Sequence, residues 1–189
     1  MGTLKKTSQK RSQAVKIVGI DPALRNTGIV SADLINNDIK INYVKLIETT
    51  TLNEKPKAVD DYKRINFIYN NLRLIIDNHD LIIAEFPIGS QSSRAMVSYA
   101  TSISILACFN KPIIPVTPND IKKYIGIKNA SKSDSINYVR QHYPNFPFIL
   151  KNNKILNKNE HLADAMIAIL AGIKKADDEP AFINFFQLL

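Results

Sequence analysis

The sequence predicts one mixed α/β domain built on a five-stranded sheet with helices on both faces. The first part of the chain holds three consecutive strand-like segments joined by short turns, which is typical of an antiparallel meander. Further along, helical segments alternate with short apolar strands, and helical crossovers place such strands in parallel. A chain of 189 residues with 45% hydrophobic residues can bury one sizeable core.

The meander is expected to occupy the region before residue 50. Residues 15–21 form an apolar run, and a turn over 22–26 leads to a second strand over 27–34. The polar turn 36–38 precedes a third strand over 39–48, whose apolar and polar residues alternate. That alternation indicates a strand with one exposed face.

Helices and short strands follow the meander. Apolar residues at helical spacing identify the helices, and Thr117 followed by Pro118 is typical of a helix start. In order, we expect a helix over 59–78, a strand over 81–86, a helix over 92–109, a strand over 112–116, a helix from Pro118, and helices over 133–142 and 160–175. The segment 144–159 is rich in Asn, Lys and Pro, and we expect a mobile loop there.

The net charge of +8 is unevenly distributed. The first sixteen residues carry five basic residues and no acid, and a second basic concentration runs from Lys122 to Lys158. Such clusters attract polyanions. We expect residues 1–14 to be a flexible basic arm, residues 15–176 the folded domain, and residues 177–189 a tail that packs on the core or on a partner.

Two features bear on the location of the protein in the cell. No segment approaches the roughly 18 apolar residues of a membrane span, so we expect no membrane association. Cys108 is the single cysteine and lies in an apolar stretch, which predicts a buried thiol in a reducing compartment. Together they indicate a cytoplasmic protein.

Three carboxylates lie in apolar surroundings. Asp21 and Glu85 end predicted strands, and Asp164 lies within the last predicted helix. A carboxylate beside an apolar core is costly to desolvate unless it is paired, protonated or bound to a cation. If the strands of Asp21 and Glu85 are parallel neighbours, both residues end at the sheet edge where α/β proteins bind ligands. Oxygen ligands suit Mg²⁺ or Mn²⁺, which can activate water for phosphodiester hydrolysis.

His161 and Asp164 are three residues apart and share one helix face. His161 could bind a metal ion or transfer a proton near neutral pH. Taken one at a time, these residues have structural alternatives: a surface histidine, an aspartate paired with a lysine, and a turn-capping role for Asp21. Glu160 lies near the same face, and its part in a site stays open.

Four segments resemble motifs of the RuvC-type Holliday-junction resolvases of the RNase H-like superfamily. They are residues 18–28, VGIDPALRNTG; residues 83–86, IAEF; residues 126–133, GIKNASKS; and residues 161–168, HLADAMIA. The resemblance spans residues 15–171. It implies an RNase H-like fold and a homodimeric endonuclease that uses Mg²⁺ or Mn²⁺ to make paired, symmetric nicks in four-way DNA junctions, in a bacterial or phage-infected cell, although an organelle stays possible.

By motif match, the resemblance assigns the catalytic metal site to Asp21, Glu85, His161 and Asp164. The family has Asp or His at the position of His161, which leaves its role open. Lys132 would lie near the scissile phosphate and stabilise developing charge, with a solvated surface lysine as the alternative.

The residues expected to contact DNA are Phe86, Ser90, Gln91, Arg94, Lys122, Lys123, Lys128 and Lys132. Phe86 would stack on an unpaired base or pack in the core. The polar segment 89–94 either holds a phosphate or is an ordinary capped helix start. The helix over 92–109 is rich in apolar residues and would form a two-fold interface.

Two other functions fit the same acidic residues. One is a monomeric RNase H-like nuclease acting on RNA or an RNA–DNA hybrid. The other is a catalytically silent protein that binds branched DNA, which the presence of all four site residues disfavours.

Overall fold

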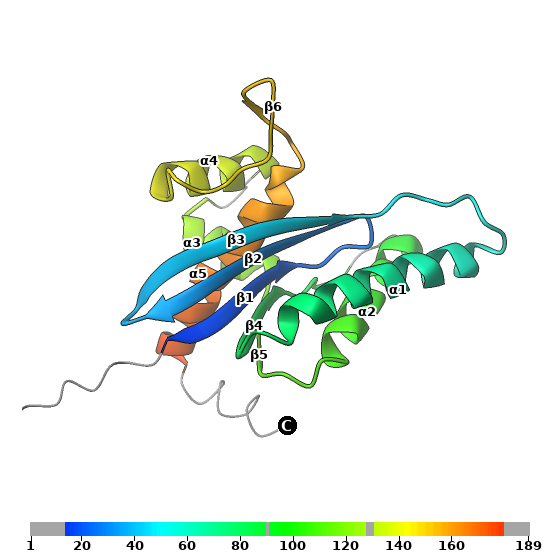
Figure 1. Cartoon of the computed structure of the whole chain (residues 1–189), viewed down its shortest axis with the longest axis horizontal. Helices are drawn as coiled ribbons and strands as arrows, with labels where there is room; N and C mark the ends of the chain where they lie inside the picture. Colours follow the sequence, from blue (N-terminus) through cyan, green and yellow to red (C-terminus); the bar gives the residue numbers. More distant parts are fainter. Residues whose placement is uncertain (1–13, 90, 128–130, 180–189) are drawn as a thin grey trace, which may run out of the picture.

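The computed structural model describes residues 14–89, 91–127 and 131–179. Its five-stranded sheet has the strand order β3-β2-β1-β4-β5, and helices cover both faces (Figure 1). The elements are β1 (Val15–Asp21), β2 (Asn26–Ile35), β3 (Asp38–Glu48), α1 (Lys57–Ile76), β4 (Leu81–Glu85), α2 (Ser93–Ala107), β5 (Ile113–Val116), α3 (Pro118–Ile125), α4 (Lys132–His142), β6 (Leu150–Lys151), β7 (Lys154–Ile155) and α5 (Asn159–Asp178). The expected fold class is confirmed.

The sheet combines both strand pairings, as the connections require. β1 pairs antiparallel with β2, and β2 with β3. β1 pairs parallel with β4, and β4 with β5. The parallel connections run through α1 and α2, because a strand can return in the same direction only by a crossover.

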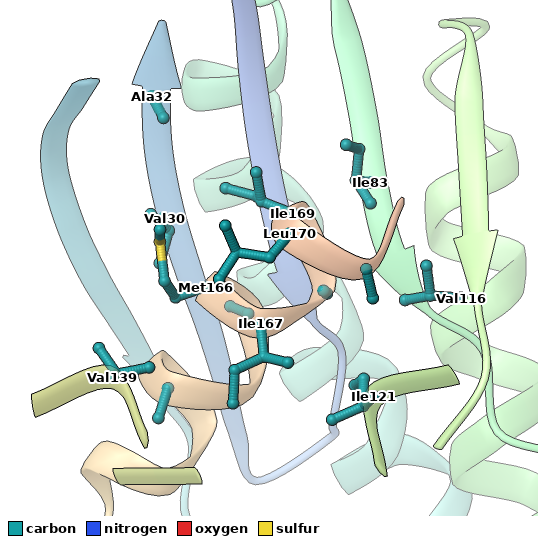
Figure 2. Close-up of a cluster of buried hydrophobic side chains, with 14 of the residues drawn as sticks. Val30, Ala32, Ile83, Val116, Ile121, Val139, Met166, Ile167, Ile169 and Leu170 are labelled. Carbon is teal, nitrogen blue, oxygen red and sulfur yellow. The ribbon is translucent and has the colours of Figure 1, made fainter. Parts of the chain in front are cut away.

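Successive residues of β1 point to opposite faces of the sheet, which gives two hydrophobic clusters. Ile17 belongs to the cluster under α5, whereas Val18 and Ile20 belong to the cluster under α1 and α2. Figure 2 shows the first cluster, in which side chains of α5 lie among residues of the sheet and of α3 and α4. The labelled residues are Val30, Ala32, Ile83, Val116, Ile121, Val139, Met166, Ile167, Ile169 and Leu170.

α5 approaches the sheet more closely than side chains would normally allow. A Cβ atom at Gly19 of β1 would lie 2.4 Å from the carbonyl oxygen of Ala165, and one at Gly28 of β2 would lie 2.0 Å from that of His161. Only glycine fits at such distances from a helix backbone. The two glycines therefore set how near the first half of α5 lies to β1 and β2.

The expected mobile loop over 144–159 is wrong in part, because it contains the β6–β7 hairpin. The turn residues Asn152 and Asn153 have φ angles of 50° and 59°. Asn36 and Asn37, in the turn between β2 and β3, have similar values of 52° and 67°. Asparagine tolerates this left-handed conformation, so two consecutive asparagines can close a tight hairpin.

The expected burial of Cys108 is also wrong. Cys108 is exposed at the end of α2, where Ile105 and Leu106 take the inward positions. In the described part of the chain, no helix is both long and apolar enough to cross a bilayer. The predicted arm lies outside the described residues except for Ala14, and of the predicted tail only 177–179 are described, where α5 continues to Asp178.

We expect Gly28→Ala to lower the free energy of unfolding by about 2–4 kcal/mol. The new methyl group would overlap the backbone of α5, which can move only with its whole packed face. Urea denaturation followed by circular dichroism measures the change. As a control, Gly89→Ala meets no atom within 4 Å but has a φ of 124°, so its cost should be limited to backbone strain of about 1–2 kcal/mol. Equal stability of Gly28→Ala and the wild type would contradict the close approach.

Candidate active site

The carboxyl ends of β1 and β4 meet the first turns of α5. In the parallel register, Ile20 of β1 lies opposite Ala84 of β4, so Asp21 and Glu85 end neighbouring strands. His161 and Asp164 come from the face of α5 above them. These four side chains, together with Glu160, line one cavity of about 420 Å³. The structure thus brings together residues from three distant segments of the chain.

His161 is held by contacts on both ring nitrogens. Its Nδ1 lies 2.6 Å from Oδ2 of Asp21. Its Nε2 lies 3.4 Å from the amide nitrogen of Asn26 and 3.5 Å from Oε1 of Glu160. Burial lowers the pKa of His161, but the hydrogen bond and charge of Asp21 and the charges of Glu160 and Asp164 outweigh it, so the pKa is raised. The contact with Asp21 therefore favours the protonated form of the imidazole relative to a free histidine.

The other two carboxyl groups hold their protons unusually tightly. Burial, with the charges of Asp21 and Asp164, raises the pKa of Glu85 to about 8, although Lys122 lowers it. Burial and Asp21 raise the pKa of Asp164 to about 6, against a hydrogen bond from Ser135 and the charge of His161. When ionised, these carboxylates therefore place more negative charge in the cavity than its neighbours neutralise.

This excess of negative charge is the condition that a divalent cation would relieve. Carboxylate oxygens with one imidazole are a donor set that suits Mg²⁺ or Mn²⁺. In the described residues, no three His, Cys, Asp or Glu side chains converge on a single point as in an assembled metal site. Asp21 instead accepts a hydrogen bond from His161. The chemistry fits a cation, while the side chains are arranged around the cavity rather than around one ion.

A buried arginine fixes the loop that follows Asp21. Arg64 of α1 donates from Nη2 to the carbonyl oxygen of Leu24 at 2.9 Å and from Nε to Oγ1 of Thr49 at 3.0 Å. The Thr49 hydroxyl donates to the same carbonyl oxygen at 2.5 Å. These bonds hold the loop from Asp21 to β2 against α1. Helical spacing relative to Ile68 and Leu72 places Arg64 on the inner face of α1, but no local pattern indicates its partners.

Sequence reasoning also missed Ser135. This residue of α4 is buried, and its hydroxyl donates a hydrogen bond to Asp164. Ser135 and Val139 are four residues apart and both face inward. Helical spacing could have placed Ser135 on the inner side of α4, but no local pattern indicates its partner on α5.

The two lysines predicted on α3 have different surroundings. Lys122 is partly buried and lies near enough to Glu85 to lower its pKa. Lys123 is exposed and lines another cavity, with Asp120 and Lys175. Of the two, only Lys122 acts on the carboxylate site.

Several of the remaining predicted DNA contacts lie along the segment that follows β4. Phe86 is half-buried and packs against the hydrophobic cluster under α1 and α2, whereas Gln91 is exposed. Arg94 forms a two-pronged ion pair with Asp61 of α1, at 2.5 and 2.6 Å. This ion pair ties the start of α2 to α1. Ser90, Lys128 and the side chain of Lys132 lie outside the described residues.

Comparison with known proteins gives one consistent family. No family model matches the sequence. The chain is 31% identical over 166 residues to the crossover junction endodeoxyribonuclease RuvC of Finegoldia magna, covering 84% of this chain and 93% of the relative. It is 26% identical over 184 residues to RuvC of Treponema denticola, covering 94% of this chain and 96% of the relative.

Solved structures of resolvases share the fold. RuvC of Thermus thermophilus in complex with a Holliday junction substrate has a TM-score of 0.63 at 16% identity, covering 86% of this chain and 96% of that one. The Fowlpox virus resolvase in complex with Holliday junction DNA has a TM-score of 0.52 at 21% identity, covering 87% and 98%. The likeness to the Finegoldia protein extends over nearly the whole of both chains, and on that basis this chain belongs to the RuvC family of crossover junction endodeoxyribonucleases.

Proposed function

We propose that this protein is a metal-dependent endonuclease that resolves four-way DNA junctions by paired, symmetric nicks. The observation that carries the proposal is the cavity at the carboxyl ends of β1 and β4, where Asp21, Glu85, His161 and Asp164 meet. Membership of the crossover junction endodeoxyribonuclease family supports the substrate class.

The four residues would together hold Mg²⁺ or Mn²⁺. When bound, such an ion activates a water molecule and stabilises the departing oxygen of a phosphodiester. His161, hydrogen-bonded to Asp21, can hold or release a proton at Nδ1. Lys122 supplies positive charge beside Glu85, and we retain Lys132, the first residue of α4, as a further cation near the phosphate.

We further propose that the protein acts as a homodimer through α2. The amino-terminal half of this helix leaves Met96 and Val97 about half exposed, at 45% and 50%. Its buried residues are confined to Ser102, Ile105 and Leu106 in the second half. A two-fold axis along the exposed half would present two sites to the two symmetric strands of a junction.

Asp21→Asn should lower the cleavage rate on the order of a thousandfold or more, because it removes the carboxylate that contacts His161 and would hold the metal ion. Junction binding should persist, since the basic surface is unchanged. The measurement is single-turnover cleavage of a labelled four-way junction with Mg²⁺ or Mn²⁺, beside linear duplex and an RNA–DNA hybrid.

Asp38→Asn is the matched control, because it removes the same charge from the exposed first residue of β3. Symmetric nicks confined to the junction would support the proposed function. Cutting of the hybrid would instead place the activity with the RNase H class, and tight junction binding without cleavage would make the protein a structural binder.

Glu85→Gln should stabilise the metal-free protein at alkaline pH. The pKa of Glu85 is raised to about 8 from 4.5, so the folded protein holds this proton more tightly than the unfolded chain. The stability that this proton gives the folded protein is fully present below the pKa of Glu85 in the unfolded chain. It is lost as the pH rises through the pKa of Glu85 in the folded protein. At pH 8.5 in EDTA, we expect the free energy of unfolding of the variant to exceed that of the wild type by on the order of 2 kcal/mol.

Urea denaturation at pH 6 and pH 8.5 tests this prediction. Mg²⁺ or Mn²⁺ should raise the stability of the wild type at pH 8.5 more than that of Glu85→Gln, because the ion binds the native carboxylates. An identical pH dependence in the two proteins would show that Glu85 is ionised in the metal-free fold.

Lys122→Ala should lower the single-turnover cleavage rate by about 10- to 100-fold, because it removes the positive charge that lowers the pKa of Glu85. Lys123→Ala removes an equal charge from the outward side of the same helix and separates this effect from a general loss of attraction for DNA. At saturating enzyme, its cleavage rate should fall much less than that of Lys122→Ala. Equal losses of cleavage rate in the two variants would mean that Lys122 contributes only to the overall electrostatic attraction for DNA.

A further inference from the structure

The β6–β7 hairpin projects from the domain beyond α4 (Figure 1). Its residues 150–154 are all exposed. The surrounding segment, residues 144–158, contains three lysines and no acidic residue. Residues 151–154, KNNK, therefore present a basic and amide-bearing tip to solvent, with Leu150 exposed beside it.

The strand pairing places two of these lysines against each other. Lys151 and Lys154 are direct cross-strand partners on either side of the two-asparagine turn. Like charges directly opposite each other destabilise an antiparallel pair. A hairpin that keeps two ammonium groups side by side is suited to an anionic ligand that relieves their repulsion.

The base of the hairpin is fixed to the helix that carries the active site. Asn159, the fully buried first residue of α5, accepts a hydrogen bond from the amide of Ile149 at 2.7 Å. Its side-chain amide donates to the carbonyl oxygens of Ile149 and Leu156, each at 2.8 Å. Ile149 and Leu156 flank the two strands, so one side chain holds both ends of the hairpin.

Aromatic packing reinforces this attachment. The rings of Phe146 and Phe148 lie 4.7 Å apart just before the hairpin, and Phe146 is buried in the cluster under α5. Asn159 lies two residues before His161. The hairpin tip is therefore held in a defined position relative to the catalytic cavity, although it projects into solvent.

We propose that the β6–β7 hairpin binds the phosphate backbone of a junction arm close to the nick, through Lys151 and Lys154. At about 3.3 Å per strand residue, the tip lies roughly 10–15 Å from the first turn of α5. One DNA strand advances about 3.4 Å per nucleotide, so the contacted phosphates lie about 3–5 nucleotides from the scissile one. This inference rests on the proposed junction-binding function and adds to it the element that positions the arm.

The test compares the double variant Lys151→Ala/Lys154→Ala with the wild type on a four-way junction, in EDTA so that the DNA stays intact. Loss of two phosphate contacts should weaken binding roughly tenfold at 0.1 M salt and reduce the slope of log Kd against log salt by about 2. The matched control is Lys40→Ala/Lys174→Ala, which removes two exposed lysines of β3 and of the carboxyl-terminal part of α5. The control should bind nearly as tightly as the wild type.

Methylphosphonate linkages give the position of the contact. Neutral linkages placed 3–5 nucleotides from the nick should weaken the wild type and the control variant but should not weaken the hairpin variant further. A hairpin variant with the affinity and salt slope of the wild type would overturn the inference. A hairpin variant that loses affinity yet remains as sensitive to the neutral linkages as the wild type would also overturn the inference. Lys151 and Lys154 would then contribute only to the overall electrostatic attraction of the protein for DNA.

Failure of this inference can be told apart from failure of the proposed function. Specific junction cleavage by the wild type together with unaffected hairpin variants would overturn the hairpin contact alone. A wild type that neither binds nor cuts the junction would overturn both.

Discussion

The position of the carboxylate-lined cavity depends on the direct contact of α5 with the backbone of β1 and β2. Gly19 and Gly28 carry no side chain where α5 crosses them. Gly28 is the cross-strand partner of Asp21, and its nearest neighbour on α5 is the backbone of His161. The same contact therefore sets the distance between helix and sheet and the distance between His161 and Asp21. A larger residue at Gly28 would move α5 away from the sheet and His161 away from Asp21. One close contact therefore determines both the packing of the helix and the geometry of the cavity.

That arrangement has an electrostatic cost. Four acidic side chains and one histidine line a single cavity, and the pKa values of two of the acids, Glu85 and Asp164, are raised to about 8 and about 6. A fold selected only for stability would not gather these groups, because each buried charge must be desolvated. Two neighbouring groups offset part of this electrostatic cost, because Ser135 donates a hydrogen bond to Asp164 and Lys122 places positive charge near Glu85. In addition, Arg64 holds the loop after Asp21 in place. The surrounding framework thus holds together a set of carboxylates that repel one another when ionised.

The sequence was informative where periodicity or a local motif carries the signal, and silent where a contact joins distant segments. The predicted ranges of the sheet strands and main helices agree with the structure within a few residues, since burial imposes a period of 2 or 3.6 on them. The hairpin was missed because two-residue strands are too short to show any period. Lys122 and Lys123 are equivalent in sequence and differ only through the packing of α3. Ser135 and Arg64 were missed for the same reason: their partners lie on other elements.

Asn159 links the β6–β7 hairpin to α5. Its side chain satisfies backbone groups at both ends of the hairpin while its backbone begins α5. A buried amide that makes three hydrogen bonds is costly to displace, because any movement would leave polar groups unpaired. The hairpin and the start of α5 must therefore move together. Since α5 is in turn held against β1 and β2 at Gly19 and Gly28, a phosphate bound at the hairpin tip would be placed relative to Asp21 by a continuous chain of rigid contacts. If the proposed hairpin contact holds, such a chain would let a contact several nucleotides away determine which phosphodiester enters the cavity.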